Sequence, residues 1–231
     1  MLNNINSVYK FQYGNMYAQD RFVQKRFKLY KVLLTPYLKG KPKILDIGCY
    51  TADILRILSH PVNYYGIDAD KQALEIAKNR GAKTIRLDID NEEIPLKEKF
   101  DIIIATEILE HLRDPEKLLL QIRHLLKTEG IVLLSLPNEC TIYHRLKVLL
   151  GKGIDGTAFA PHYHLHFPTI KQSNEFISKH FKIIEKQYWI HTGVGAKLDK
   201  FLTKIPDRIW LSLANLWPSL FARGVIYLCR K

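Results

Sequence analysis

Residues 43–53 read KILDIGCYTAD, an apolar run followed by a glycine and then by mostly polar residues. A short run rich in Ile and Leu indicates a buried strand. A glycine directly after such a run lets the backbone turn tightly. The stretch therefore predicts a strand over residues 43–47, a turn at Gly48 and a helix through residues 54–58.

The same alternation of strand and helix continues along the chain. Similar apolar runs predict strands over residues 63–67, 83–87, 100–105 and 131–135. Helices are predicted over residues 70–80, ended by Gly81, and from Asp114-Pro115 to about residue 126. Strands that alternate with helices through short connections form parallel β-α-β units. The sequence thus predicts an α/β fold with helices on both faces of one sheet.

The flanking segments are expected to extend this unit. An amphipathic helix is predicted over residues 20–38, and Thr169 with Gln172 has the pattern of a capping box that opens a helix to about residue 179. Two more strands are predicted over residues 181–186 and 224–229. Residues 139–168 are expected to be irregular. No linker of low complexity interrupts the chain, so we expect one domain with two insertions.

Composition narrows the class of protein. The chain has 231 residues, 47% of them hydrophobic and 25% charged, which suits one core but not two domains of ordinary size. Collagen-like, disulfide-framework and wholly disordered proteins are excluded. Cys49, Cys140 and Cys229 form no Cys-x-x-Cys pair, which excludes a zinc ribbon and fits a reducing compartment. With no signal-peptide pattern and no apolar run of about 18 residues, a cytoplasmic location is expected.

The chain is strongly basic, with 35 Lys and Arg against 23 Asp and Glu, a formal net charge of +12. Such a charge favours a nucleic acid, an anionic membrane surface or a phosphorylated small molecule as partner. The alternative is that the basic side chains only face solvent. The apolar and aromatic stretch over residues 197–221 is compatible with a lid over an apolar substrate, with a helix at a membrane surface, or with ordinary core packing.

Acidic residues recur at the ends of predicted strands. Asp46 lies in the first strand, Asp68 follows the second and Asp88 the third. Ligands of open parallel sheets bind outside the carboxyl ends of the strands, where a carboxylate can accept hydrogen bonds from a ribose. Gly48 is the one glycine of the first turn, whereas a dinucleotide fingerprint needs three to seat a pyrophosphate. The pattern therefore favours a nucleoside ligand over a dinucleotide.

These segments resemble the class I S-adenosylmethionine-dependent methyltransferases. The resemblance rests on ILDIGC (44–49), GID (66–68), LDI (87–89), FDII (100–103), EILEHL (107–112) and LPN (136–138). The last two point to the subgroup that includes quinone-biosynthesis O-methyltransferases. The resemblance implies a Rossmann-like, doubly wound sheet of seven strands, mostly parallel, with one antiparallel strand near the C-terminus. It also implies a helical cap (1–40), a cofactor-binding core (41–138) and substrate-side insertions (139–168 and 190–222) within one domain.

The resemblance also implies roles for individual residues. Asp46, Gly48 and Cys49 would line the methionine part of S-adenosylmethionine, with Tyr50 in the same loop, and Asp68 would hold the ribose. Asp88 and Ile89 would contact the adenine, and Thr106 would lie beneath the sulfonium. The family has glycine where this chain has Tyr50 and Ala52. A tyrosine is expected to fit there only with a negative φ. From position alone, Tyr13, Tyr17 and Arg26 are expected to cap the pocket.

Methylation of a hydroxyl also requires a group that takes the proton. Candidates are His111, after the fourth strand, and His162, His164 and His166. In an extended segment these last three would share one face. Because histidines are more often structural than catalytic, each is a candidate only. We assign His111 and His164 as the catalytic residues.

A metal-assisted alternative rests on Glu107, Glu110 and His111. On a helix these positions share a face and can converge on a divalent cation. Some relatives with this string use it, together with a later histidine, to methylate the ribose 2′-hydroxyl of small RNAs. The string also occurs in relatives without a metal, where Glu110 and His111 anchor the start of a helix. We predict no metal site.

The sequence thus predicts a methyltransferase that acts on the oxygen of a small or lipid-like acceptor, with peripheral membrane contact and RNA as further possible partners. The alternatives are a metal-assisted RNA ribose methyltransferase and a non-catalytic scaffold that only binds the cofactor. Methylation of nucleic-acid bases is disfavoured, because no Asn/Asp-Pro-Pro-aromatic string follows the fourth strand and Cys140 follows Glu139 rather than a proline. The sequence leaves the oligomeric state open.

Overall fold

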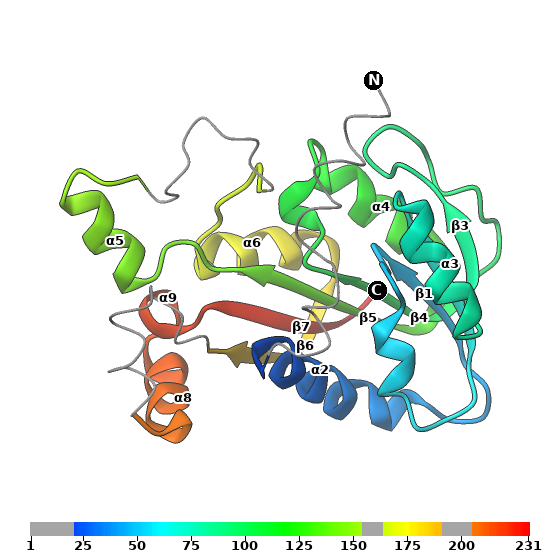
Figure 1. Cartoon of the computed structure of the whole chain (residues 1–231), viewed down its shortest axis with the longest axis horizontal. Coiled ribbons are helices and arrows are strands. Elements are labelled where there is room, and N and C mark those ends of the chain that lie inside the picture. The colour runs from blue at the N-terminus through cyan, green and yellow to red at the C-terminus, as the bar shows by residue number, and fades with distance from the viewer. Residues whose placement is uncertain (1–20, 154–163, 191–204) are drawn as a thin grey trace.

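The structure is a computed structural model that describes residues 21–153, 164–190 and 205–231. These residues form one sheet of seven strands in the order β3-β2-β1-β4-β5-β7-β6 (Figure 1). The strands are β1 (Lys43–Ile47), β2 (Asn63–Asp68), β3 (Lys83–Arg86), β4 (Phe100–Thr106), β5 (Leu126–Pro137), β6 (Lys182–Trp189) and β7 (Gly224–Arg230).

Strands β1 to β5 pair in parallel, and β7 lies antiparallel between β5 and β6. The predicted Rossmann-like sheet, with one antiparallel strand near the C-terminus, is confirmed. Because the order reverses on either side of β1, the carboxyl ends of β1 and β4 face a crevice of the kind in which open sheets bind ligands.

Helices cover both faces of the sheet (Figure 1). One face packs against α4 (Pro115–Leu125) and α6 (Ile170–His180), whose buried side chains include Leu119 and Ile177. The other face packs against α2 (Arg21–Leu34) and α3 (Lys71–Asn79) through Leu34 and Ala77. Alternate residues of β4, such as Ile103 and Ile104, enter opposite cores, which is why this strand is apolar throughout.

Side-chain caps begin several helices where the sequence predicted them. Asp114 accepts a hydrogen bond from the Lys117 amide at the start of α4. Thr169 and Gln172 form the predicted capping box of α6. The predicted helix over residues 20–38 is interrupted by Pro36, and a 3-10 turn, η1 (Thr35–Tyr37), follows α2.

Two local predictions are wrong, and one condition of the metal-assisted alternative is not met. In place of a helix over residues 54–58 there is a 3-10 turn, η2 (Asp53–Arg56), and Ala52 before it is in the left-handed region. Residues 107–111 are not an α-helix, because Glu107 has a φ of 53° and η3 (Leu109–His111) is a single 3-10 turn. Within the segment expected to be irregular, α5 (Ile142–Leu149) is a helix.

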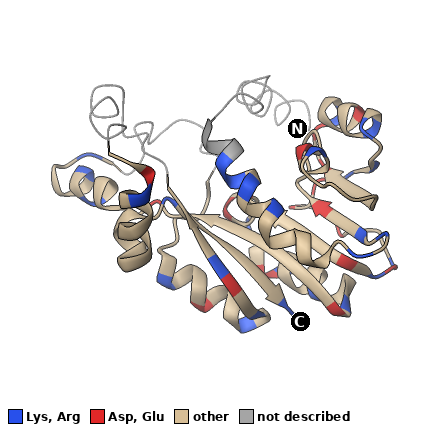
Figure 2. Cartoon of the chain, turned by 90° about the horizontal axis from the view of Figure 1, so that it is seen from below, with Lys and Arg blue, Asp and Glu red and all other residues tan. Residues whose placement is uncertain are grey.

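The C-terminal insertion contributes α8 (Asp207–Leu216) and α9 (Pro218–Phe221), which lie near α5 at one end of the molecule (Figure 1). No described helix is long and apolar enough to cross a membrane. In the view of Figure 2, Lys and Arg are distributed over several elements and are interspersed with Asp and Glu.

Candidate active site

The turn after β1 is held by the neighbouring strand. The backbone amides of Gly48 and Cys49 both donate to the carbonyl oxygen of Ile67, at 2.8 and 3.0 Å. Gly48 has a φ of 74°, and a Cβ atom there would lie 2.7 Å from Cδ1 of Ile108. A side chain at this position would therefore be strained and would enter the space between the turn and η3.

Tyr50 overturns one expectation. Its φ is 47°, and that of Ala52 is 54°, so both residues keep the backbone conformation that glycine would adopt. The Tyr50 amide donates to Oδ2 of Asp68 at 2.7 Å, which holds the turn in this shape. A non-glycine residue in the left-handed region costs about 1–2 kcal/mol. The loop thus retains its conformation at a cost in stability.

The acidic residues at the strand ends differ in environment. Asp46 is 3% exposed and accepts a hydrogen bond from the Tyr64 hydroxyl. Burial raises the pKa of Asp46 to about 7. Asp68 accepts from the amides of Tyr50 and Asp70, and burial raises its pKa as well. Asp88 accepts from the Asp90 amide and the Asn91 side chain.

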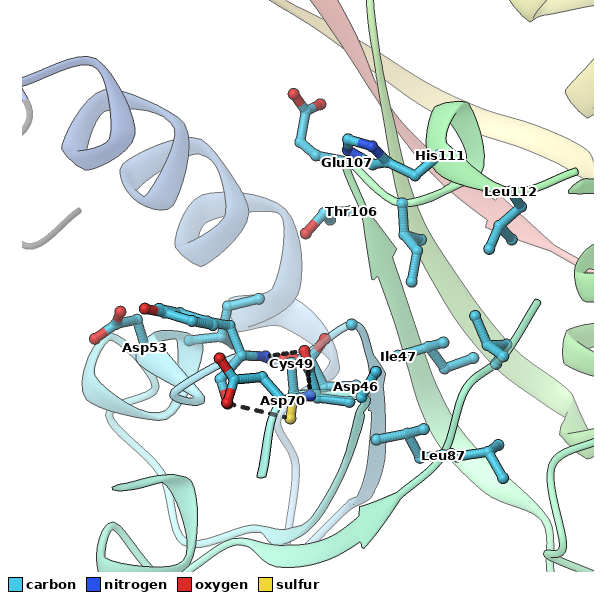
Figure 3. A pocket seen from close by; sticks show the side chains of 18 of the residues that line it. Asp46, Ile47, Cys49, Asp53, Asp70, Leu87, Thr106, Glu107, His111 and Leu112 are labelled. Atoms are coloured by element: carbon cyan, nitrogen blue, oxygen red, sulfur yellow. Dashed lines mark hydrogen bonds between the residues drawn. The ribbon is translucent and has the colours of Figure 1, made fainter. Parts of the chain in front are cut away.

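These residues surround a cavity of about 260 Å³ at the carboxyl ends of β1, β2 and β4 (Figure 3). Its lining includes every residue predicted to bind the cofactor: Asp46, Gly48, Cys49, Tyr50, Asp68, Asp88, Ile89 and Thr106. His111 and Arg26 also line it. Tyr13, Tyr17 and His162 lie outside the described residues.

The donor set fits S-adenosylmethionine. Each oxygen of Asp68 accepts one backbone hydrogen bond and keeps a further lone pair for a ribose hydroxyl. The side chains of Ile47, Leu87 and Ile89 supply apolar walls of the kind that a flat purine needs. Asp46 can counter the positive charge of the methionine part.

Glu107 lies at the rim of the cavity and is held from two sides. Its carboxylate accepts from the Ser135 hydroxyl at 2.8 Å and forms an ion pair with Arg26 at 2.6 Å. The Arg26 guanidinium also lies 4.9 Å from the centre of the Trp189 ring. Glu107 therefore joins α2 to β5, and it does not share a helix face with Glu110 and His111 as the metal-assisted alternative requires.

The two predicted catalytic histidines lie together. The rings of His111 and His164 are 4.8 Å apart between centroids and meet edge to face. His111 lines the cavity, whereas His164 lies behind it and places Nδ1 3.4 Å from the carboxylate of Glu139. His166 faces elsewhere, with Nε2 2.8 Å from the carbonyl oxygen of Leu112.

Glu139, two residues after the end of β5, is a buried charge that was not predicted from the sequence. Burial opposes its ionisation, but the hydrogen bond from His164 and the charge of Arg223 lower the pKa of Glu139 to about 2. Arg223 lies 3.1 Å from it, and the ring of His144 lies 3.5 Å away. An ionised carboxylate is thus fixed behind His164.

Comparison with known proteins now identifies the fold family. The family model of a methyltransferase domain matches residues 17–180. The chain belongs to this methyltransferase family. The predicted family and the S-adenosylmethionine cofactor are thereby confirmed.

Curated relatives of this methyltransferase include the ubiquinone biosynthesis O-methyltransferase of Pelagibacter ubique, 36% identical over 107 residues, which are 42% of each chain. That of Glaesserella parasuis is 27% identical over 185 residues, covering 68% of this chain and 76% of the relative. The chain spans about half the length of the first curated relatives that it matches.

Solved structures show the same fold at low identity. Magnesium protoporphyrin IX methyltransferase from Synechocystis has a TM-score of 0.60 at 12% identity, covering 90% of this chain and 83% of that one. The [4+2]-cyclase SpnF has a TM-score of 0.62 at 17% identity, covering 90% and 81%. Because one of these neighbours is named as a cyclase, the fold alone does not fix the reaction.

Some residues of the methyltransferase site gave a sequence signal, and others did not. Arg26 was predicted at the pocket from its position, and the structure places it there. Glu139 and Ser135 had no motif that marked them. The one available signal was that each is a polar residue inside an apolar strand or shortly after it. Such a residue needs a polar partner when it is buried, so its position indicates a structural contact.

Proposed function

We propose that this chain is a class I methyltransferase that transfers the methyl group of S-adenosylmethionine to an oxygen atom of a small or lipid-like acceptor. The observation that carries the proposal is the cavity at the ends of β1, β2 and β4, which gathers all the predicted cofactor residues and also His111. Family membership and the name shared by the curated relatives support the same reaction.

The cofactor supplies an electrophilic methyl group bound to a positive sulfur. The acceptor oxygen forms a bond to the methyl carbon while the carbon–sulfur bond breaks and its electron pair stays on sulfur. The hydroxyl proton must leave at the same stage. His111 and His164 are the proposed catalytic residues, because His111 opens onto the cavity and His164 contacts it.

Calorimetry with S-adenosylhomocysteine tests cofactor binding. Asp68→Ala removes the proposed ribose contacts, and since hydrogen bonds to a charged group contribute about 1.5–3 kcal/mol, we expect at least tenfold weaker binding. Asp101→Ala is the matched control, because Asp101 lies in β4 near its start, at the end away from the cavity, and pairs with Lys127. Equal binding by the wild type and Asp68→Ala would refute the assignment of Asp68 to the ribose, and absence of any binding heat with either would favour a non-catalytic scaffold.

The acceptor class is inferred from the exposed surface of α5, the helix that follows β5. Helix α5 exposes Leu146, Val148 and Leu149, and Leu150 follows it, with exposed fractions of 52%, 52%, 80% and 73%. Exposed Arg145 and Lys152 flank them. Apolar side chains flanked by basic residues favour contact with an anionic lipid surface, where an apolar acceptor would be found.

Three measurements separate the possible partners. A phenolic acceptor with a polyprenyl tail should react faster than its tail-free analogue, in line with the quinone-related name of the relatives. Leu149→Ser should weaken sedimentation with anionic vesicles and leave the tail-free reaction unchanged. Preferential methylation of RNA over both phenols would favour the ribose methyltransferase instead.

A cytoplasmic location and the division into cap, core and insertions remain predictions.

A further inference from the structure

A second cavity borders the same turn, η3, as the cofactor cavity. It has a volume of about 390 Å³ and lies between β5 and the first turns of α4 and α6. Leu109 and Glu110 line this second cavity, whereas Ile108 and His111 line the cofactor cavity. Among the described residues, none lines both. A ligand of the second cavity would therefore occupy a site separate from that of the cofactor.

The second cavity has the size and the walls of a small-molecule site. An apolar cavity of about 150 Å³ holds one benzene molecule, and ligand pockets commonly have about 300–1,000 Å³. Its walls include Leu109, Leu136, Phe167 and Phe176, which suit an apolar and preferably aromatic body. Phe167 and Gln172 line the cavity and are exposed to solvent, so a ligand can enter from the surface.

Glu110 gives this cavity an acidic group. Its side chain is completely buried, and neither carboxylate oxygen has a hydrogen-bond partner among the described residues. Nε2 of His111 lies 3.9 Å from Oε1 of Glu110, too far for a hydrogen bond. Burial raises the pKa of the Glu110 carboxyl group, with the neighbouring Glu107 as the second cause. A buried carboxyl group without hydrogen bonds is costly, so a donor in the cavity would stabilise it.

Ser173 and His166 offer further polar atoms to the same cavity. Ser173 is 1% exposed, and its hydroxyl has no partner in hydrogen-bond geometry among the described residues. It lies near the Tyr227 hydroxyl, which donates to Oδ1 of Asn174 at 3.0 Å. Nε2 of His166 donates to the Leu112 carbonyl oxygen, which leaves Nδ1 of the neutral ring able to accept. The polar atoms available in the cavity are thus mainly acceptors.

A positively charged donor fits these acceptors best. An ammonium group carries three N–H donors and no acceptor, and its charge favours the ionised form of a neighbouring carboxyl group. Phe167 and Phe176 add aromatic rings, whose faces attract cations. No Lys or Arg among the described residues lines the cavity, so these residues do not supply the charge themselves. A neutral hydroxyl would bring one donor and no charge.

We propose that the second cavity binds a small aromatic amine in its ammonium form. The ammonium group contacts Glu110 and Ser173, and the aromatic body lies against Phe167 and Phe176. The proposal goes beyond methyl transfer, because neither the methyl donor nor the acceptor has to enter this cavity. The bound amine contacts the same turn as the cofactor, through the residues that the cofactor cavity does not use.

Calorimetry of the full chain with tryptamine, tryptophol and indole-3-acetate tests the preference for positive charge. These compounds share an indole ring and end in an ammonium, a hydroxyl and a carboxylate group. We expect one equivalent of tryptamine to bind at least tenfold more tightly than tryptophol, and indole-3-acetate to give no binding heat. Equal affinities for tryptamine and tryptophol would overturn the proposal. So would the absence of heat with tryptamine, which would leave water as the partner of Glu110.

Two variants test the residues that hold the ammonium group. Glu110→Gln keeps the size of the side chain but removes its charge, so it should weaken tryptamine binding at least tenfold. Ser173→Ala should weaken it about threefold. Glu175→Gln is the matched control, because Glu175 is an exposed carboxylate on the same helix as Ser173 and does not line the cavity. Its affinity should equal that of the wild type. Equal affinities of the wild type, Glu110→Gln and Ser173→Ala would refute the site.

The cofactor cavity is also acidic, so a third measurement separates the two sites. Tryptamine is titrated into the wild type saturated with S-adenosylhomocysteine, and into Asp68→Ala. One-to-one binding that persists in both supports the second cavity, whereas loss of binding in either would place the amine in the cofactor cavity and overturn the proposal. Binding of S-adenosylhomocysteine without tryptamine would refute the amine site alone. Binding of tryptamine without S-adenosylhomocysteine would refute the cofactor assignment alone.

Discussion

The two sides of the candidate site are built in different ways. The cofactor side consists of residues at or just beyond the ends of consecutive strands, such as Asp46, Asp68 and Asp88. The other side, at the ends of β4 and β5, joins Glu107 to Arg26 of α2, and Glu139 to Arg223, which lies 84 positions further along the chain. The first side can therefore be predicted from short sequence motifs. The second side depends on contacts between distant segments, which only the folded structure shows.

The ion pair between Arg26 and Glu107 provides the largest expected effect. Both side chains are mostly buried, with 16% and 23% exposed, and removal of one partner leaves a poorly solvated charge. Because a fully buried pair costs about 3–5 kcal/mol when broken in this way, we expect Arg26→Met to lower the free energy of unfolding by about 2 kcal/mol. Urea denaturation of the wild type and Arg26→Met measures this difference in the free energy of unfolding.

The double variant Arg26→Met/Glu107→Gln sharpens the same comparison. If the cost arises from the unpaired carboxylate, the double variant should be more stable than Arg26→Met alone. Equal stability of the two would show that Arg26 acts through its packing against Trp189, which lies under the guanidinium.

The turn after β1 tests the cofactor side. Gly48 and Tyr50 both have positive φ, but one is a glycine and the other is not. Gly48→Ala should lower the free energy of unfolding by about 1–2 kcal/mol and weaken S-adenosylhomocysteine binding. Tyr50→Gly removes the strain of a non-glycine residue at positive φ. It should therefore lower the thermal unfolding temperature less than Gly48→Ala does. If Tyr50→Gly lowered the unfolding temperature more than Gly48→Ala, the contacts of the tyrosine ring would stabilise the fold by more than its strained backbone destabilises it.

Those parts of the fold that depend on residues close together in the sequence could be predicted from it. Asp114-Pro115 and the Thr169–Gln172 box begin helices because their bonds are local. The helix that the metal-assisted alternative requires at residues 107–111 does not form, because Glu107 takes a positive φ while its side chain accepts a hydrogen bond from Ser135 of β5. Likewise, the burial of Glu139 depends on Arg223 and His164, which no short window of sequence contains.

The pH dependence of cofactor binding separates the carboxylates of the cofactor side. Burial raises the pKa of Asp46 to about 7, so this group is largely protonated below that pH in the folded chain. A cationic ligand favours the ionised form. Affinity for S-adenosylhomocysteine, whose amino group is positive, should therefore fall by up to tenfold per pH unit below about 7. In Asp46→Asn this slope should disappear.

The same shift predicts the pH dependence of stability. An unfolded aspartate ionises near pH 4, whereas the folded chain keeps the proton on Asp46 up to about pH 7. Asp46 therefore makes the free energy of unfolding fall between about pH 4 and pH 7, and it has no further effect above that range. Asp46→Asn, compared with the wild type by urea denaturation across this range, isolates the contribution of this residue.

The smallest expected effect concerns the helix that follows the His164 segment. The Thr169 side chain accepts from the Gln172 amide at 3.2 Å, and the Gln172 side chain accepts from the Thr169 amide at 2.9 Å. Loss of an N-cap typically costs about 1 kcal/mol, so Thr169→Ala should lower the free energy of unfolding by about that amount. Cofactor affinity should stay unchanged, because Thr169 does not line the cofactor cavity. If cofactor affinity fell as far as in Gly48→Ala, the two sides of the site would be energetically coupled, and their separate construction would no longer imply separate behaviour.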